Sequence, residues 1–183
     1  VSIESALDIL RTLPFEQVAG SHIDHHRELR TAIPEVIFAQ NKRPEDVVRI
    51  AEAMLRQSGR FLITRSNRET FEMLAYTKAI YHEASRAIVC GRQREKKGKV
   101  VVISAGTSDI PVAEEAVVTL NFLGSETETI YDIGVAGIHR LFSHLPVMHA
   151  AHVIIAVAGM EGALPSVLGG LTSTPVIAVP TSV

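Results

Sequence analysis

The chain has 183 residues, of which 46% are hydrophobic and 21% charged, a composition typical of a packed globular protein. Its net charge of −2 gives no basic field for nucleic acid or an anionic membrane, so we expect neither as a partner. The one cysteine, Cys90, excludes a disulfide framework and indicates a reducing cytoplasm. No apolar run reaches the roughly 18 residues that span a bilayer, and no signal-peptide pattern is present.

The first half of the chain mixes helix and strand patterns and predicts a small α+β module over residues 1–97. The helices carry boundary signals: Pro14 ends the first, Pro44 opens the second, and Asn67 can cap the third. Short runs of branched and aromatic residues predict the strands between them. In chain order we expect a helix over 2–13, a strand over 35–39, a helix over 44–55 with Gly59 just beyond it, a strand over 60–65, a helix over 67–74 and a strand over 86–91.

The basic stretch over residues 91–99 is interpreted as a solvated linker, because no aromatic residues interleave with its charges to stack on bases. After it, apolar strand runs alternate with helix patterns, which predicts a parallel sheet covered on both faces. We therefore expect a three-layer α/β domain over residues 98–183. Its expected strands are 99–104, 128–132, 152–159 and 175–180, and its expected helices are 111–123, 138–148 and 164–168.

Three loops should meet at the carboxyl edge of this sheet. The first, residues 106–109, is neither the dinucleotide fingerprint nor a Walker loop. Gly106 permits a tight turn whose following N–H groups face an anion, and Thr107 and Ser108 can donate to phosphate or ribose oxygens. Asp109 would repel phosphate, so it suits a ribose hydroxyl or a proton transfer. The alternative is that Ser108 or Asp109 merely caps the following helix.

The second and third loops, residues 132–140 and 158–165, carry further polar candidates. Arg140 offers a bidentate clamp for phosphate or carboxylate. His139 is an acid or base candidate, although a partly buried structural histidine is the simpler interpretation. Glu161 suits general acid–base catalysis if it is partly buried, and is otherwise a plain loop charge.

A cluster of histidines near the start of the chain suggests a metal site. His22, His25 and His26 are spaced so that a helix would bring them to one face. No fourth ligand is specified, and Asp24 lies off that face. We therefore interpret the cluster as a structural motif at a domain or subunit boundary and expect no metal there.

The loops taken together resemble the PurE family of aminoimidazole ribonucleotide (AIR) carboxylases and carboxyaminoimidazole ribonucleotide mutases. The resemblance rests on "SAGTSDIPVAEEAVVTLNFLG", "VAGIHRL" and "AGMEGALPSVLGGLTSTPVIAVP". Two features depart from that family. Ala163 stands where PurE carries a histidine, and PurE proteins lack so long an N-terminal module.

Both departures from PurE agree with a second family, LarB, which this chain resembles more closely. Its N-terminal domain resembles "DHHRELRTAIPEVIFAQNKRPEDVVRIAEAML", and its PurE-like domain resembles "AGTSDIPVAEEA" and "PVIAVPTSV". LarB proteins make the mononucleotide precursor of the nickel-pincer nucleotide cofactor. In that family the chain continues past "PTSV" to a nucleophilic cysteine. Cys90 does not match the position of that cysteine, so we expect this chain to lack the nucleophile. We therefore also expect the natural protein to be longer than this chain.

The resemblance implies that nicotinic acid adenine dinucleotide is carboxylated with CO2 or bicarbonate and that its phosphoanhydride is hydrolysed, releasing AMP. It implies an octamer with no tightly bound cofactor, and Mg²⁺ is plausible with the pyrophosphate. The open alternatives are a purine-pathway AIR carboxylase or mutase and a nucleotide-binding regulatory domain without catalysis. Asp109 and Glu161 are the expected catalytic residues, and the expected substrate contacts are Gly106, Thr107, Ser108, His139, Arg140, Gly159, Met160, Thr181 and Ser182.

Overall fold

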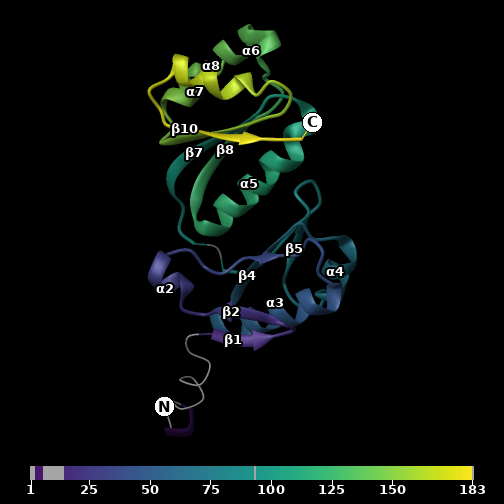
Figure 1. Ribbon diagram of the computed structural model, residues 1–183. Helices are drawn as coiled ribbons and strands as arrows, with labels where there is room; N and C mark the ends of the chain where they lie inside the picture. The colour runs from purple at the N-terminus through teal and green to yellow at the C-terminus, as the bar shows by residue number, and fades with distance from the viewer. Residues whose placement is uncertain (1–2, 6–14, 93, 183) are drawn as a thin grey trace. The chain divides into compact units, whose positions relative to one another are not determined.

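The computed structural model describes residues 3–5, 15–92 and 94–182, which form the two compact units drawn in Figure 1. The units are Val1–Arg92 and Gln93–Val183, and each has its own hydrophobic core. The predicted division after residue 97 falls in the first strand of the second unit, β7 (Lys97–Ser104). The end of the basic stretch is therefore strand rather than linker.

The first unit contains a four-stranded mixed sheet and a separate two-stranded hairpin. The sheet has the order β3-β4-β6-β5, in which β3 runs parallel to β4 and the other pairs are antiparallel. The hairpin pairs β1 with β2. The elements are β1 (Phe15–Val18), β2 (Ser21–Asp24), α2 (Arg27–Thr31), β3 (Ile37–Phe38), α3 (Pro44–Ser58), β4 (Arg60–Thr64), α4 (Arg68–Met73), β5 (Ile80–His82) and β6 (Ala87–Gly91).

Helix α3 shows why these residues fold locally as they do. Pro44 occupies its first turn, and Gly59 ends it with a left-handed φ of 69° that glycine adopts at little cost. Its apolar positions recur at helical spacing and pack into the core of the first unit, as Ile50 and Met54 do. Asn67 caps α4 as predicted, because its side chain accepts a hydrogen bond from the backbone N–H of Thr70.

Three features of the first unit were not predicted, namely the β1–β2 hairpin, the short helix α2 and the edge strand β5. The hairpin turns at Ala19 and Gly20, which both have positive φ, a combination that suits the right-handed twist of paired strands. Its strands read "FEQV" and "SHID" and carry too few branched residues to stand out as strands. The helix predicted over 2–13 lies, apart from residues 3–5, outside the described residues.

The second unit is a three-layer α/β fold, which confirms the predicted fold class. Its sheet is wholly parallel, with the order β10-β9-β7-β8. Helix α5 lies on one face, and α6, α7 and α8 lie on the other (Figure 1). Successive residues of β7 serve opposite layers, because Val101 packs in the core under α6–α8 and Val102 packs under α5. The elements after β7 are α5 (Ile110–Leu123), β8 (Ser125–Ile130), α6 (Ile138–Phe142), α7 (Leu145–His149), β9 (Val153–Ala158), α8 (Ala163–Leu171) and β10 (Val176–Pro180), with short 3-10 turns at Thr107–Asp109 and Val135–Gly137.

Two predicted elements of this unit show the largest differences in extent from the structure. The helix expected over 138–148 is two short helices, because Pro146 lacks the N–H that a continuous helix needs and lies instead in the first turn of α7. Strand β8 begins at Ser125 rather than 128, since an edge strand accommodates the polar "SETE" run. None of the described helices combines the length and apolar character required to cross a bilayer.

Candidate active site at the carboxyl edge of the sheet

A cavity of ≈ 220 Å³ lies at the carboxyl edge of the second unit's sheet, lined by the loops that follow β7, β8 and β9. The three loops predicted to converge therefore do so within this unit. Small side chains make most of the lining, which leaves backbone groups accessible to a ligand. The lining residues are Ala105, Gly106, Ser108, Asp109, Gly134, Val135, Ala136, Ala158, Gly159, Met160, Glu161, Ala163 and Leu164.

Asp109 is buried at the base of the first loop, with 3% of its surface exposed. Its Oδ2 accepts a hydrogen bond from the backbone N–H of Gly106 at 2.9 Å, and its Oδ1 accepts one from the hydroxyl of Thr181 at 2.7 Å. The carboxylate makes no cap hydrogen bond to α5, so the simple capping interpretation of Asp109 is wrong. Asp109 shapes the loop while still lining the cavity, and each of its oxygens keeps a second lone pair for a ligand.

The two hydroxyls of the first loop differ in position. Ser108 and Thr107 are both exposed, but only Ser108 lines the cavity. Among the described residues, the Ser108 hydroxyl has no hydrogen-bond partner, so it does not cap α5 and is available to a ligand. Thr107 belongs to the short 3-10 turn and does not reach the lining.

The second loop contributes backbone and small side chains rather than its predicted polar residues. Gly134, Val135 and Ala136 line the cavity, whereas His139 and Arg140 lie on α6 outside the lining. His139 is exposed, so its interpretation as a partly buried structural histidine is wrong.

The guanidinium of Arg140 is turned toward the start of the second loop. Its Nη1 lies 3.2 Å from Oδ2 of Asp132, and the two side chains form an ion pair. Arg140, which was predicted to bind an anionic group of the ligand, is therefore paired here with a carboxylate of its own loop.

The third loop brings Gly159, Met160 and Glu161 to the cavity, as expected. Met160 has a positive φ of 50° and is 91% exposed, so its side chain stands at the mouth rather than in the core. Glu161 is exposed too, so it lacks the partial burial that was the condition for its acid–base role. Its carboxylate makes no hydrogen bond or ion pair with the described residues. Ser182 is exposed and lies outside the lining.

The charges around the cavity divide into two kinds. Asp109 and Glu161 are the charged side chains among its lining residues, and no described lysine, arginine or histidine is among them. The N-termini of α5 and α8 also open on this edge, at Ile110 and Ala163, and each carries partial positive charge on its free N–H groups. The arrangement suits a ligand with a cationic or proton-exchanging centre near the carboxylates and an anionic group near the amides.

Sequence reasoning missed the stretch Gly134–Ala136, which forms one wall of the cavity. The polar residues that suggested chemistry, His139 and Arg140, lie farther along the same loop. The signal in the sequence was Gly134 itself, a glycine shortly after the strand β8. In the structure, a Cβ at this residue would lie only 3.0 Å from the carbonyl oxygen of Ala105. Glycine is favoured there because the first two loops approach each other closely.

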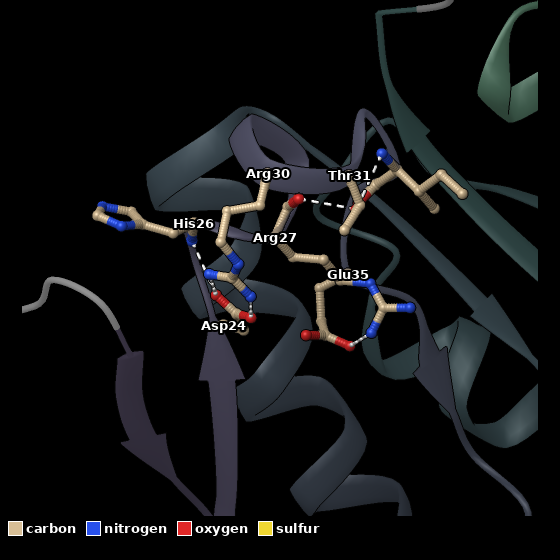
Figure 2. Close-up of polar contacts among 7 residues, drawn as sticks. Asp24, His26, Arg27, Arg30, Thr31 and Glu35 are labelled. Atoms are coloured by element: carbon tan, nitrogen blue, oxygen red, sulfur yellow. Dashed lines mark hydrogen bonds and ion pairs between the residues drawn. The ribbon is translucent and has the colours of Figure 1, made fainter.

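The histidines of the first unit do not share a helix face, so the helical arrangement assumed for them is wrong. His22 lies in β2, and His25 and His26 follow it in a turn. Figure 2 shows the Asp24 carboxylate between the backbone N–H of His26 and the guanidinium of Arg30, with the His26 ring directed away. No three histidine, cysteine, aspartate or glutamate side chains of the described part of the chain form a metal-binding group.

The polar groups beside these histidines pair with one another. The side chain of His25 is almost wholly buried, and its Nε2 lies 3.1 Å from a carboxylate oxygen of Glu16. The hydrogen bonds donated by Arg30 lower the pKa of Asp24. Figure 2 also shows Arg27 paired with Glu35, at 3.6 Å. These contacts connect β1, β2, α2 and the loop before β3, which fits a structural motif within the unit.

Comparison with known proteins matches both units separately. Residues 15–93 match the LarB/PurE-like N-terminal domain, and residues 99–183 match the AIR carboxylase domain. The chain is 42% identical over 174 residues to the uncharacterized protein MJ0165 of Methanocaldococcus jannaschii, covering 87% of this chain and 67% of that protein. It is 38% identical over 84 residues to N5-carboxyaminoimidazole ribonucleotide mutase of the same organism, covering 44% of this chain and 51% of that protein.

The two domain matches follow each other in the order that the sequence predicted. The mutase match covers less than half of this chain, whereas the match to MJ0165 extends over both units. Both domains support a role in a carboxylase family. The chain therefore belongs to the LarB family, with a LarB/PurE-like N-terminal domain followed by a PurE-like AIR carboxylase domain.

Proposed function

We propose that the protein carboxylates the pyridinium ring of nicotinic acid adenine dinucleotide and hydrolyses the phosphoanhydride of this substrate. The products are pyridinium-3,5-biscarboxylic acid mononucleotide and AMP, for synthesis of the nickel-pincer nucleotide cofactor. The observation that carries the proposal is one cavity in which two carboxylates and two helix N-termini come together. Family membership supplies the reaction class, and the cavity supplies groups suited to it.

The size of the cavity matches part of this substrate. At ≈ 220 Å³ it is smaller than the roughly 300–1,000 Å³ of pockets that enclose a drug-sized molecule. A pyridinium ring with its ribose suits that space, and the AMP half then extends beyond it. The apolar walls from Val135 and Leu164 favour an aromatic ring, and Ser108 is positioned to donate to a ribose or phosphate oxygen.

The chemistry requires a nucleophile, because an electron-poor pyridinium does not attack CO2. A thiolate that adds to the ring gives a dihydropyridine, whose enamine carbon then attacks CO2. Loss of the ring proton and expulsion of the thiolate restore the aromatic ring. Although Glu161 is exposed in the free chain, it lines the cavity and has no partner among the described residues, and we propose that it accepts that proton at the cavity mouth. Asp109 orients the ribose and the first loop.

The thiolate does not come from Cys90. That residue is buried on β6, within the core of the first unit, and does not line the cavity. We propose no resident cofactor. Mg²⁺ enters with the substrate's pyrophosphate, because magnesium is commonly held by one or two carboxylates together with substrate phosphates. The proposal also includes a homo-oligomer in the cytoplasm.

A second candidate function is the AIR carboxylase or mutase reaction. It is favoured by the match between the second unit and N5-carboxyaminoimidazole ribonucleotide mutase. Two features oppose it: Ala163 stands at the cavity where PurE carries a histidine, and a whole LarB/PurE-like N-terminal domain precedes the second unit. Simple nucleotide binding without catalysis is the third candidate.

The test is to incubate the full-length natural protein and ¹³C-bicarbonate with each of the two nucleotides and to follow the products by mass spectrometry. We expect the nicotinic acid substrate to gain one labelled carboxylate and to release AMP. Labelling of the imidazole nucleotide alone would establish the second candidate, and binding without labelling of either would establish the third.

Variants then test the catalytic residues. Glu161→Gln should lower carboxylation by about 10²-fold or more, the usual contribution of a general acid or base. Asp109→Asn should lower carboxylation too, because Asp109 orients the ribose and the first loop. Glu126→Gln removes the same charge from the exposed, opposite end of β8 and should leave the rate unchanged. Near-normal carboxylation by Glu161→Gln and Asp109→Asn would remove both residues from the mechanism.

A further inference from the structure

We propose that Asp132 sets the affinity of the site for anionic groups by competing with them for Arg140. The inference rests on the proposed function in one respect, namely that a phosphate-bearing nucleotide occupies the cavity. In the present arrangement Arg140 is held by Asp132, and an incoming phosphate takes the place of that carboxylate. Asp132 is thus a positioning residue that acts through Arg140.

The ion pair lies within the loop that forms the second wall of the cavity. Asp132 follows β8 and Arg140 lies on α6, so the pair spans the stretch that contains Gly134–Ala136. Nη1 of Arg140 lies 3.2 Å from Oδ2 of Asp132. Arg140 is the arginine of this loop, while the cavity lining itself has no described cation.

The guanidinium lies against the backbone of the same loop. A Cβ built on Gly137 would fall 2.5 Å from Nε of Arg140 and 2.8 Å from its Nη2. The absence of a side chain at Gly137 therefore leaves the space that the guanidinium occupies, one residue beyond the cavity-lining Ala136. A flexible arginine at this place needs only side-chain rotation to change partners.

The energetics of the pair suit an exchange of partners. The side chains of Arg140 and Asp132 are 45% and 52% exposed, so water screens their attraction. An exposed pair of this kind lowers the affinity of Arg140 for a competing ligand by no more than about five-fold. A phosphate accepts two parallel hydrogen bonds from a guanidinium and carries more charge than one carboxylate, so it competes effectively.

The Asp132→Asn variant isolates this effect. Asp132 has a positive φ of 58°, and asparagine tolerates that conformation at least as well as aspartate. Its backbone N–H donates to Oγ of Ser104 at 3.3 Å, and the substitution leaves that group in place. The loop should therefore keep its shape while the charge that holds Arg140 is removed.

The experiment measures the binding of inorganic pyrophosphate by isothermal titration calorimetry. The proteins are wild type, Asp132→Asn, Arg140→Gln, the double variant and the Glu126→Gln control. We expect Asp132→Asn to tighten binding by about two- to five-fold and Arg140→Gln to weaken it. Asp132→Asn should have no effect once Arg140 is glutamine, because the two residues act as one unit.

The outcomes separate this inference from its alternatives. If Asp132→Asn tightens pyrophosphate binding as much in the Arg140→Gln background as in wild type, the effect is a general reduction of negative charge and the inference is wrong. The same holds if Glu126→Gln tightens pyrophosphate binding as much as Asp132→Asn does. The inference is also wrong if neither wild type nor any variant binds pyrophosphate. Pyrophosphate carries no ring, so its binding does not depend on the proposed reaction. If the variants show the expected changes in pyrophosphate affinity but neither nucleotide is carboxylated, only the proposed function is refuted.

Discussion

The carboxylate of Asp109 and the hydroxyl of Thr181 join two strand ends of one sheet. Oγ1 of Thr181 donates to Oδ1 of Asp109 at 2.7 Å, while Oδ2 accepts from the backbone N–H of Gly106 at 2.9 Å. Thr181 follows β10, so one buried carboxylate connects this edge strand to the loop after β7. This link defines one side of the candidate active site.

Replacing Asp109 tests whether that link supports the loop. Asp109→Ala leaves the Gly106 N–H and the Thr181 hydroxyl without their acceptor and should lower the free energy of unfolding by about 1–3 kcal/mol. Asp109→Asn keeps an oxygen for the Gly106 N–H and should cost less. Hydrogen exchange at the Gly106 amide measures the effect locally, and equal exchange rates in wild type and the alanine variant would contradict this role.

The cap of α4 gives an independent test in the first unit. The side-chain oxygen of Asn67 accepts from both the backbone N–H and the hydroxyl of Thr70, at 2.9 and 2.7 Å. Asn67→Ala should therefore lower the free energy of unfolding by about 1 kcal/mol, and Asn67→Asp, which keeps the acceptor, should lower it less. Urea denaturation measures both. Equal losses for the two variants would show that the cap oxygen is not the stabilising group.

The helices and strands that were predictable are those with local signals. Pro44 and Gly59 define the limits of α3 because proline and glycine restrict or permit particular backbone angles. The apolar runs of β7 and β9 predict buried parallel strands because both faces of those strands are covered. By contrast, the β1–β2 hairpin depends on packing against α3, which no local pattern records.

The site was partly predictable for a similar reason. The rule that parallel strands present their carboxyl ends at one edge placed Asp109 and Glu161 in one cavity. The direction of each side chain follows from contacts between distant residues, and sequence spacing does not contain it. The bond between Asp109 and Thr181 and the ion pair between Arg140 and Asp132 are contacts of this kind.

Tyr131 provides a prediction about pH. Burial, together with the hydrogen bond it donates to Glu114 on α5, raises the pKa of Tyr131 from 10.0 to about 12. Because the folded-state value is the higher one, the stability that this contact contributes is fully present below about pH 10 and is lost as the pH rises toward 12. The difference in unfolding free energy between wild type and Tyr131→Phe should therefore be constant below pH 10 and shrink above it.

The matched control for this prediction is Tyr76, on the other unit. The hydrogen bond that Tyr76 donates to Glu52 raises its pKa to about 12 as well. In a spectrophotometric titration, Tyr131→Phe and Tyr76→Phe should each remove one late-ionising phenol. Glu114→Gln should lower the pKa of Tyr131 alone. A Tyr131 that ionises at the same pH with and without Glu114 would show that burial accounts for the whole shift.

Three glycines of the second unit predict three different outcomes on substitution by alanine. At Gly134 a Cβ would lie 3.0 Å from the backbone oxygen of Ala105, so Gly134→Ala should separate the first two loops and lower the unfolding free energy by about 1–3 kcal/mol. At Gly137 the atoms nearest to a Cβ would be those at the flexible end of Arg140, so stability should change little while the ion pair with Asp132 is broken. Gly169 lies on an exposed part of α8 with open space around it, and Gly169→Ala should raise stability by about 0.5–1 kcal/mol.

Urea denaturation and pyrophosphate titration together distinguish these outcomes. Gly134→Ala should weaken pyrophosphate binding as well as stability, since both loops line the cavity. In the Gly137→Ala background, Asp132→Asn should no longer change pyrophosphate affinity, because Arg140 has already left its partner. A Gly137→Ala protein in which Asp132→Asn still tightens binding as it does in wild type would mean that the guanidinium does not depend on the space above Gly137.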